Sequence, residues 1–202
     1  RKDGTIVWIN LAGSIVRAGD GAPLHFLAQA EHITVRKRLE ALKAAQFAVT
    51  QVLAESATVA EAAPNLLRAI CEGLGWELGE MWRVDAGPGV LRCQSTWYPP
   101  ELEMKEIEEA ARTVTFARGA GLPGHAWADG GPVWIPDVTE DPKFVRAPIA
   151  TKYGLHRAIA FPVRAGSEIT GVMAFFGHDI REPDEQLLET AAHIGSQAGQ
   201  FI

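Results

Sequence analysis

The sequence predicts an α+β fold, in which segments with the two-residue period of strands alternate with segments that have the period of helices. Paired strand-like segments are joined by glycine-containing turns, and helical segments stand before, between and after them. One long stretch, residues 118–144, fits neither pattern. Apolar residues make up 47% of the 202 residues and charged residues 22%, which is typical of a protein with a packed core.

The overall charge and the cysteine content exclude several classes of protein. A net charge of −6 argues against a nucleic-acid partner, because phosphate binding needs a basic face. No apolar run approaches the roughly 18 residues that predict a membrane span. Cys71 and Cys93 have no metal-ligand spacing, and we expect two buried thiols in a reducing cytoplasm.

Residues 1–34 are expected to form two strands, Thr5–Arg17 and Pro23–Ile33, around a turn at Asp20-Gly21. A lone two-stranded hairpin is marginal in water. We therefore expect it to belong to a domain that the sequence enters partway.

The next segment, residues 35–54, has the period of a helix that begins at the N-cap Thr34. One interpretation is an amphipathic helix packed on its own domain. The favoured one is a dimeric coiled coil, in which polar Gln46 sets the register. The predicted seam consists of Val35, Leu39, Leu42, Gln46, Val49 and Leu53.

The remaining segments alternate between helix and strand. Helices are expected over Thr58–Trp76 and Glu101–Arg112, and strands over Glu77–Asp85, Val90–Tyr98, Arg157–Arg164 and Glu168–Phe176. A last helix starts at Pro183 and repeats the heptad spacing, so its apolar positions are predicted as a second dimer seam. These are Leu187, Ala191, Ile194, Ala198 and Phe201.

The stretch 118–144 is much longer than the usual connection of about 4–6 residues. It holds five glycines and four prolines, yet its aromatic content is too high for a disordered segment. We interpret it as an ordered lid over a pocket. Gly119-Ala120-Gly121 precedes a helix-compatible run, and a simple turn is favoured over an anion site there.

No familiar catalytic or metal-binding spacing occurs, and the carboxylates of residues 101–109 fit a solvated helix face. An enzyme is therefore not expected. A pocket under the lid would be largely apolar with a few polar groups. Its candidate lining residues are Trp82, Trp97, Phe116, Leu122, Trp127, Asp137, Phe144, Tyr153, His156 and Phe175.

Several motifs in residues 55–202 resemble those of GAF domains. They are Gly-x-Gly-Leu-Pro-Gly from Gly119, Pro-Val-Trp-Ile-Pro-Asp-Val from Pro132, Tyr-Gly-Leu-His-Arg from Tyr153 and Gly-Val-Met-Ala-Phe-Phe from Gly171. The resemblance implies a six-stranded antiparallel sheet with helices on one face and a lid over a pocket on the other. Residues 1–34 resemble the last strands of a PAS domain, although the usual final Asp-Ile-Thr reads His-Ile-Thr here; residues 35–54 would be the helical linker.

Comparison with GAF subfamilies implies no known cofactor. Bilin-binding members carry a Cys-His pair where this chain has Val145-Arg146, so covalent bilin is not expected. Haem-binding members use a histidine where Lys152 falls, which leaves haem a minor alternative through nearby His156. Free methionine sulfoxide reductases keep a catalytic cysteine where this chain has Pro123, and the Asn-Lys-Phe-Asp-Glu signature of cyclic-nucleotide binders is missing.

Two functions remain from the resemblance. In the favoured one, the segment is a cytoplasmic sensory module of a bacterial signalling protein, such as a histidine kinase or a cyclic-di-nucleotide enzyme. It would bind an unknown small molecule, dimerise with itself through parallel helices, and act on an effector domain of the same chain. In the alternative, the pocket is packed and the module only relays and dimerises. Neither nucleic acid nor membrane is an expected partner.

Overall fold

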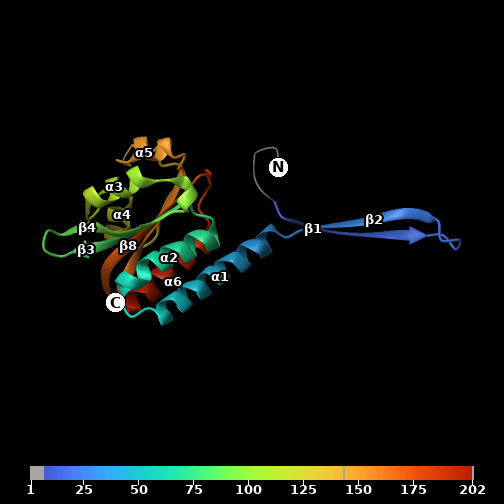
Figure 1. Cartoon of the computed structure of the whole chain (residues 1–202), viewed down its shortest axis with the longest axis horizontal. Coiled ribbons are helices and arrows are strands. Elements are labelled where there is room, and N and C mark those ends of the chain that lie inside the picture. Colours follow the sequence, from blue (N-terminus) through green and yellow to red (C-terminus); the bar gives the residue numbers. More distant parts are fainter. Residues whose placement is uncertain (1–6, 143, 202) are drawn as a thin grey trace. The chain divides into compact units, whose positions relative to one another are not determined.

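The computed structural model describes residues 7–142 and 144–201. The chain forms two compact units whose boundary lies between Lys43 and Ala44 (Figure 1). Helix α1 (Thr34–Glu55) runs across that boundary.

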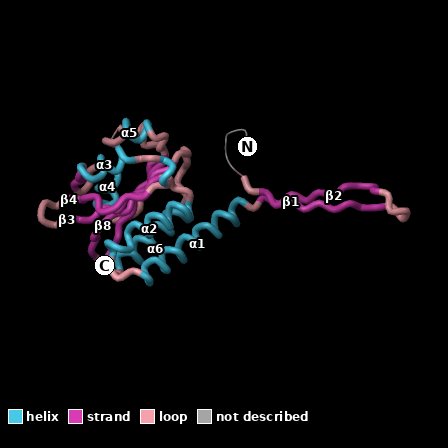
Figure 2. Tube along the Cα trace, viewed as in Figure 1, coloured by secondary structure: helices cyan, strands magenta, loops and turns pink. Residues whose placement is uncertain are grey.

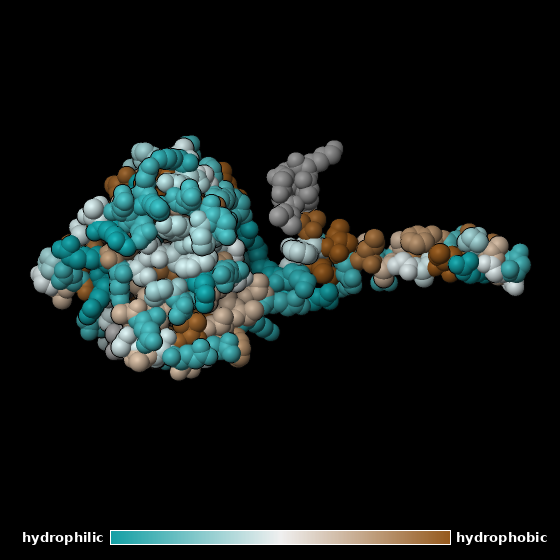
Figure 3. Space-filling view, viewed as in Figure 1, coloured by the Kyte–Doolittle hydropathy of each residue, from teal (hydrophilic) through white to brown (hydrophobic). Residues whose placement is uncertain are grey.

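The first unit contains an antiparallel hairpin of β1 (Ile9–Arg17) and β2 (Pro23–His32). The expected strand start at Thr5 and the preceding residues lie outside the described residues. Gly21 has a φ of 83°, which the turn requires. Every residue of both strands is exposed, and apolar side chains gather along the hairpin in Figure 3. The hairpin therefore has no hydrophobic core of its own.

The second unit is built on a six-stranded antiparallel sheet, which confirms the predicted α+β fold (Figure 2). Its order is β5-β4-β3-β8-β7-β6. The strands are β3 (Leu78–Asp85), β4 (Val90–Trp97), β5 (Thr115–Ala117), β6 (Val133–Ile135), β7 (Arg157–Ala165) and β8 (Glu168–Gly177). The two edge strands have three residues each, too few for an alternating pattern to reveal them.

Helices α2 (Val59–Leu74) and α6 (Glu185–Gln200), with residues 44–55 of α1, lie on one side of this sheet, which we call the helix face (Figure 1). Thr58 caps α2 and Gly75 ends it with a φ of 70°, so the helix is slightly shorter than the predicted Thr58–Trp76. Helix α6 packs very closely on β7. A Cβ at Gly195 or Gly199 would overlap the carbonyl oxygen of Pro162 or Arg164, respectively.

The helix face corrects the prediction of two dimer seams. Leu42, Val49 and Leu53 of α1 are buried within the chain, and Val49 is 0% exposed. The same holds for four seam positions of α6: Leu187, Ala191, Ile194 and Ala198. The heptad spacing therefore reflects packing inside one chain, because a buried stripe on a helix has nearly the same period whether the partner helix belongs to the same chain or another. Leu39, Gln46 and Phe201 are half-buried, and Val35 is exposed.

The opposite side of the sheet, the lid face, carries shorter elements. They are the 3₁₀ turn η1 (Pro100–Leu102), α3 (Lys105–Thr113), α4 (Gly121–Asp129) and α5 (Ala147–Lys152). The predicted helix Glu101–Arg112 is therefore wrong in its first turn. Glu103 has a φ of 46°, which breaks the helix and directs Met104 into the core, where it is buried.

The glycine motif of the lid is explained by close packing. Gly121 has a φ of 60°, and a Cβ there would stand 2.6 Å from a ring carbon of Phe116. The N–H of Gly119 donates to the carbonyl of Gly124 within the same loop, at 2.7 Å. The motif is thus a tight turn that starts α4 and lets it sit against β5.

Across residues 7–142 and 144–201, none of the helices combines the length and hydrophobicity needed to cross a membrane.

Candidate functional site

The space between the lid and the sheet is filled by one cluster of side chains, which we call the lid chamber. Strands β3, β4, β5, β7 and β8 supply its floor, and α3, α4, α5 and the loops around them supply its cover. Its large members include Trp82, Phe116, Leu122, Phe144, Leu155 and Phe176.

A buried ion pair lies in this chamber. Leu78, Glu80 and Trp82 alternate along β3, so the Glu80 carboxylate points into the chamber, where the residue is 0% exposed. Arg146 Nη1 donates to Glu80 Oε1 at 2.5 Å, and Nη2 donates to Oε2 at 2.8 Å. Trp82 Nε1 donates to Oε2 at 3.0 Å. The carboxylate is therefore held by a two-pronged guanidinium bond and one indole N–H.

Aromatic rings surround the guanidinium of Arg146. Its central carbon lies 5.4 to 5.9 Å from the ring centres of Phe176, Trp82, Phe144 and Phe116. Burial alone would lower the pKa of Arg146, but the Glu80 carboxylate raises it above its ordinary value. Among the residues that the structure describes, buried Arg146 Nε has no hydrogen-bond partner. Glu80 thus neutralises the charge of Arg146, but the Nε–H donor of Arg146 receives no acceptor from the described residues.

The two partners of this ion pair come from different layers. Glu80 belongs to a central strand, whereas Arg146 is the N-cap residue of α5, in the connection between β6 and β7 that we call the covering segment. Its neighbour Val145 is 69% exposed. One ion pair therefore connects the middle of the sheet to the outermost helix of the lid face.

Little space remains beside Arg146. The cavity beside Arg146 measures about 10 Å³ and is lined by Leu78, Ile107, Phe144, Arg146, Ile149, Ala150, Leu155 and Phe176. That volume is close to the minimum for a single water molecule. In this conformation, the guanidinium and its rings occupy the place where the sequence predicts a ligand.

Six of the ten predicted pocket residues do meet in the chamber. Trp82, Phe116, Leu122 and Phe144 are buried members of the cluster, while Trp127 and Tyr153 are half-buried against it.

Two others, Asp137 and His156, form a separate pair. His156 Nδ1 lies 3.1 Å from Asp137 Oδ1, which also accepts bonds from the backbone N–H and hydroxyl of Thr139. Burial alone would raise the pKa of Asp137, but the bonds from Thr139 and His156 outweigh it and hold that pKa below its usual value. The adjacent backbone is joined too, because the Val138 N–H donates to the His156 carbonyl at 2.7 Å.

The structure places Trp97 and Phe175 on the helix face, away from the chamber. Phe175 stacks on Phe161 at 5.8 Å, and its neighbour Phe176 enters the chamber instead. Trp97 is paired across the sheet with Gly79, and a Cβ at Gly79 would lie 2.9 Å from a ring carbon of Phe175. Trp97 therefore lies on the same face as Phe175. The register between β3 and β4 shifts between Met81 and Trp82, so the alternation of Val90–Tyr98 changes face partway along. That bulge leaves no mark in the sequence.

Glu80 and the role of Arg146 are not among the predicted site residues. A signal for Glu80 exists, because strict alternation along the strand places this carboxylate between Leu78 and Trp82 on an apolar face. A charge at such a position needs a buried partner. Nothing local marks Arg146, which lies 66 residues away.

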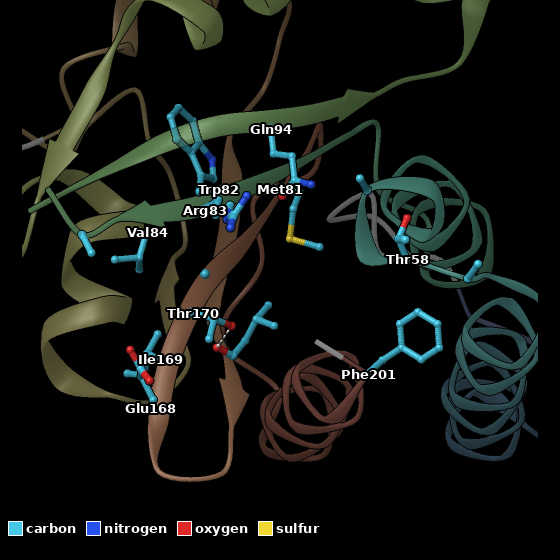
Figure 4. A pocket seen from close by; sticks show the side chains of 15 residues that line it. Thr58, Met81, Trp82, Arg83, Val84, Gln94, Glu168, Ile169, Thr170 and Phe201 are labelled. Atoms are coloured by element: carbon cyan, nitrogen blue, oxygen red, sulfur yellow. Dashed lines mark hydrogen bonds between the residues drawn. The ribbon is translucent and has the colours of Figure 1, made fainter.

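Further hollows occur in the described part of the chain, and two of them border the sheet. A groove of about 410 Å³ opens on the helix face, where Thr58, Met81, Thr170 and Phe201 lie around it (Figure 4). A hollow of about 200 Å³ adjoins the chamber between α4, β6 and the loop that leads to Phe144, and the chamber residues Leu122 and Phe144 form part of its lining. No group of three or more metal-ligating side chains occurs among the residues that the structure describes.

Both cysteines are free thiols. Cys93 is half-buried at the edge of the chamber, where burial and then the charge of Glu80 raise its pKa to about 12. Cys71 lies buried on the helix face, and burial raises its pKa still further.

Comparison with solved structures supports the fold assignment. The GAF domain of A. aeolicus nlh2, in an inactive state, is 24% identical, with a TM-score of 0.61 over 83% of this chain and 96% of that one. The GAF domain of a phosphoenolpyruvate-protein phosphotransferase from Coxiella burnetii is 16% identical, with a TM-score of 0.65 over 82% and 92%. No curated protein sequence matches the chain significantly.

A third similar structure corrects the prediction that this segment is not an enzyme. Free methionine-R-sulfoxide reductase from Neisseria meningitidis, solved with its substrate, is 19% identical, with a TM-score of 0.62 over 76% of this chain and 83% of that one. The same fold therefore also forms enzymes, and the lack of a familiar catalytic spacing in the sequence does not exclude one.

The family itself is shown by sequence. The profile of the GAF domain matches residues 56–202, which is well over half of the chain. This chain belongs to the GAF domain family, whose members are generally sensory and regulatory modules.

Proposed function

We propose that this chain is the sensory module of a multidomain bacterial signalling protein of the histidine-kinase type. In this proposal a small molecule enters the lid chamber and changes the position of the segment around α5. The change passes through the sheet to the helices on the other face. The parent protein would work in the cytoplasm, and the hairpin β1–β2 would be the end of a PAS domain.

The observation that carries the proposal is the ion pair between Glu80 and Arg146. Its carboxylate is fixed in a central strand, and its guanidinium belongs to the covering segment. A buried ion pair is weak support for stability, since its desolvation can cost as much as its attraction returns. An ion pair that closes a cover over a sheet is instead well suited to hold two positions of that cover in balance.

The sheet offers a direct route from the chamber to the helix face. Phe176 of β8 lines the chamber, and the adjacent Phe175 contacts Trp76 at the end of α2 with ring centres 6.3 Å apart. Strand β6, which leads into the covering segment, also reaches the approach to α6, because Trp134 Nε1 donates to the carbonyl of Arg181 at 3.0 Å. Displacement on one face can therefore reach residues that support α2 and α6.

Thermal-shift screening with small molecules tests the proposal. A ligand of the chamber should raise the melting temperature saturably, and Glu80→Gln should remove that effect. Glu109→Gln, at an exposed position of α3, is the matched control and should leave it intact. A screen in which every stabilising compound acts equally on both variants would contradict a ligand site in the chamber.

The second candidate function, a relay without a ligand, is favoured by one observation. The residual cavity of about 10 Å³ admits no ligand beside Arg146 in this conformation. Amide hydrogen exchange distinguishes the two functions. If the cover is ligand-gated, the amides around α5 should exchange well before those of the sheet. If it is permanently packed, they should exchange together with the amides of the core.

A homodimer also belongs to this proposal, although its contacts must differ from the predicted seams. Phe47 of α1 is 65% exposed and is a candidate for the contact. Phe47→Asp should lower the mass in sedimentation experiments from dimer to monomer without loss of helicity. An unchanged mass would argue against α1 as the interface.

A further inference from the structure

We propose that the lid chamber binds a small organic cation bearing a guanidinium or primary ammonium group, and that Arg146 occupies the site as an internal competitor. This inference rests on the proposed sensory function and names the class of ligand for the same site.

The part of the site that recognises a cation belongs to the sheet. Glu80 lies on β3, which is paired with β4 on one side and β8 on the other. Trp82 Nε1 fixes one of its carboxylate oxygens at 3.0 Å, so the carboxylate is oriented before any cation arrives. Its two oxygens receive two parallel N–H bonds from Arg146, which is the pattern that a free guanidinium reproduces.

The rings around the guanidinium are also largely independent of Arg146. Trp82, Phe116 and Phe176 come from β3, β5 and β8, and the first two meet edge to face at 5.0 Å. Ring faces attract cations, most strongly where water is excluded. A carboxylate with three ring faces would therefore remain in place if Arg146 left.

The covering segment is the part that can leave. Helix α5 has only six residues and lies in the connection between β6 and β7, outside both strands. The ion pair of Lys152 with Glu106, which links α5 to α3, has side chains more than half exposed and contributes little. Arg146 Nε is also buried without a partner among the described residues, which is a standing cost of the closed position.

The charge of the site selects a cation over an anion. An anionic ligand would have to pair with Arg146 and leave Glu80, 0% exposed, without its counter-ion. The strand holds Glu80 in place, so it cannot follow Arg146 outward. A cation that displaces Arg146 instead keeps the buried carboxylate neutralised and returns the arginine to water.

Ethylguanidinium, at concentrations well below those that unfold proteins, is the probe, and N-ethylurea is its uncharged match. Calorimetric titration of the whole chain should show saturable binding of ethylguanidinium and none of N-ethylurea. Arg146→Ala should bind the probe at least tenfold more tightly, because the internal competitor is gone. Glu80→Gln should abolish binding both alone and together with Arg146→Ala.

Arg146→Lys covers the case in which the alanine variant does not fold. It keeps the charge but cannot form the two-pronged bond, so it should bind the probe more tightly than the native chain. Binding to Arg146→Ala or Arg146→Lys without any saturable binding to the native chain would overturn the proposal, since Arg146 would then be a permanent core residue. Equal binding of ethylguanidinium and N-ethylurea would overturn it as well.

A third ligand separates this inference from the proposed function. Propionate that bound saturably and depended on Arg146 would overturn the assignment of a cation but leave a ligand-gated module standing. If neither propionate nor ethylguanidinium bound, and a wide screen also found no chamber ligand, both the inference and the proposed function would fail.

Discussion

The two faces of the central sheet are built by different rules. On the helix face, long helices with periodic apolar stripes lie close enough to β7 that two glycines of α6 are required. On the lid face, short helices and loops cover a core that contains a buried ion pair between residues 66 positions apart. The first face is specified by local repeats, and the second by contacts between distant residues. The difference indicates that one face supports the fold and the other is free to serve a site.

Among the variants that test this difference, Arg146→Ala should have the largest effect on stability. It should lower the free energy of unfolding by about 3–5 kcal/mol in urea titrations, because Glu80 is left buried without its partner. Arg112→Ala, which removes a largely exposed arginine paired with Glu108, is the control and should cost less than about 1 kcal/mol. The double change Glu80→Leu with Arg146→Met should recover most of the loss. Equal costs for Arg146→Ala and Arg112→Ala would remove the distinction between the faces.

On the helix face, the corresponding test is Gly195→Ala. Its methyl group would overlap the Pro162 carbonyl oxygen, a backbone atom that cannot yield easily, so we expect a loss of about 1–3 kcal/mol in the same titration. Gly131→Ala, where a Cβ would meet nothing within 4 Å, should stay within about 0.5 kcal/mol. If Gly195→Ala instead stabilises the protein, as helix propensity alone predicts, then α6 does not press on β7.

A smaller and pH-dependent effect is expected at the edge of the lid face. Asp137→Asn should cost about 1 kcal/mol at pH 7, because a charged acceptor of three bonds is lost. The pKa of Asp137 is lowered in the folded protein, so its contribution is complete above the unfolded value of about 3.9 and disappears as the pH falls through the folded value. The two proteins should thus converge in stability in strong acid. A difference that stayed constant down to pH 2 would show that charge is not the cause.

The last prediction needs no substitution and concerns the rate at which the two cysteines are chemically labelled. Burial raises the pKa of both thiols, so both should react slowly with a disulfide reagent at pH 8. Cys93 should react first, through opening of the lid face, and Cys71 only on global unfolding. Mass spectrometry of partly labelled protein reads the order directly. Labelling of Cys71 before Cys93 would reverse the proposed roles of the two faces.

The sequence predicts the fold well where its signals are periodic. The hairpin turn at Asp20-Gly21, the helix from Thr58 and the long strands all follow from local chemistry, and the spacing of α6 marks a truly buried stripe. It cannot tell which molecule covers that stripe, so the predicted seams were assigned to a partner chain. In the site, aromatic content identified the chamber wall, whereas the bulge in β4 and the approach of Arg146 to Glu80 depend on the folded chain as a whole.

The glycines of α6 also limit how motion can travel. With no clearance against β7, the helix cannot rotate about its axis or slide by a residue, so α6 and its strand must move together as one rigid lever. A helix of 16 residues is about 24 Å long, and a tilt of about 5° displaces its far end by roughly 2 Å. A very small tilt of the strand therefore produces a larger displacement at the end of α6, in proportion to the length of the helix.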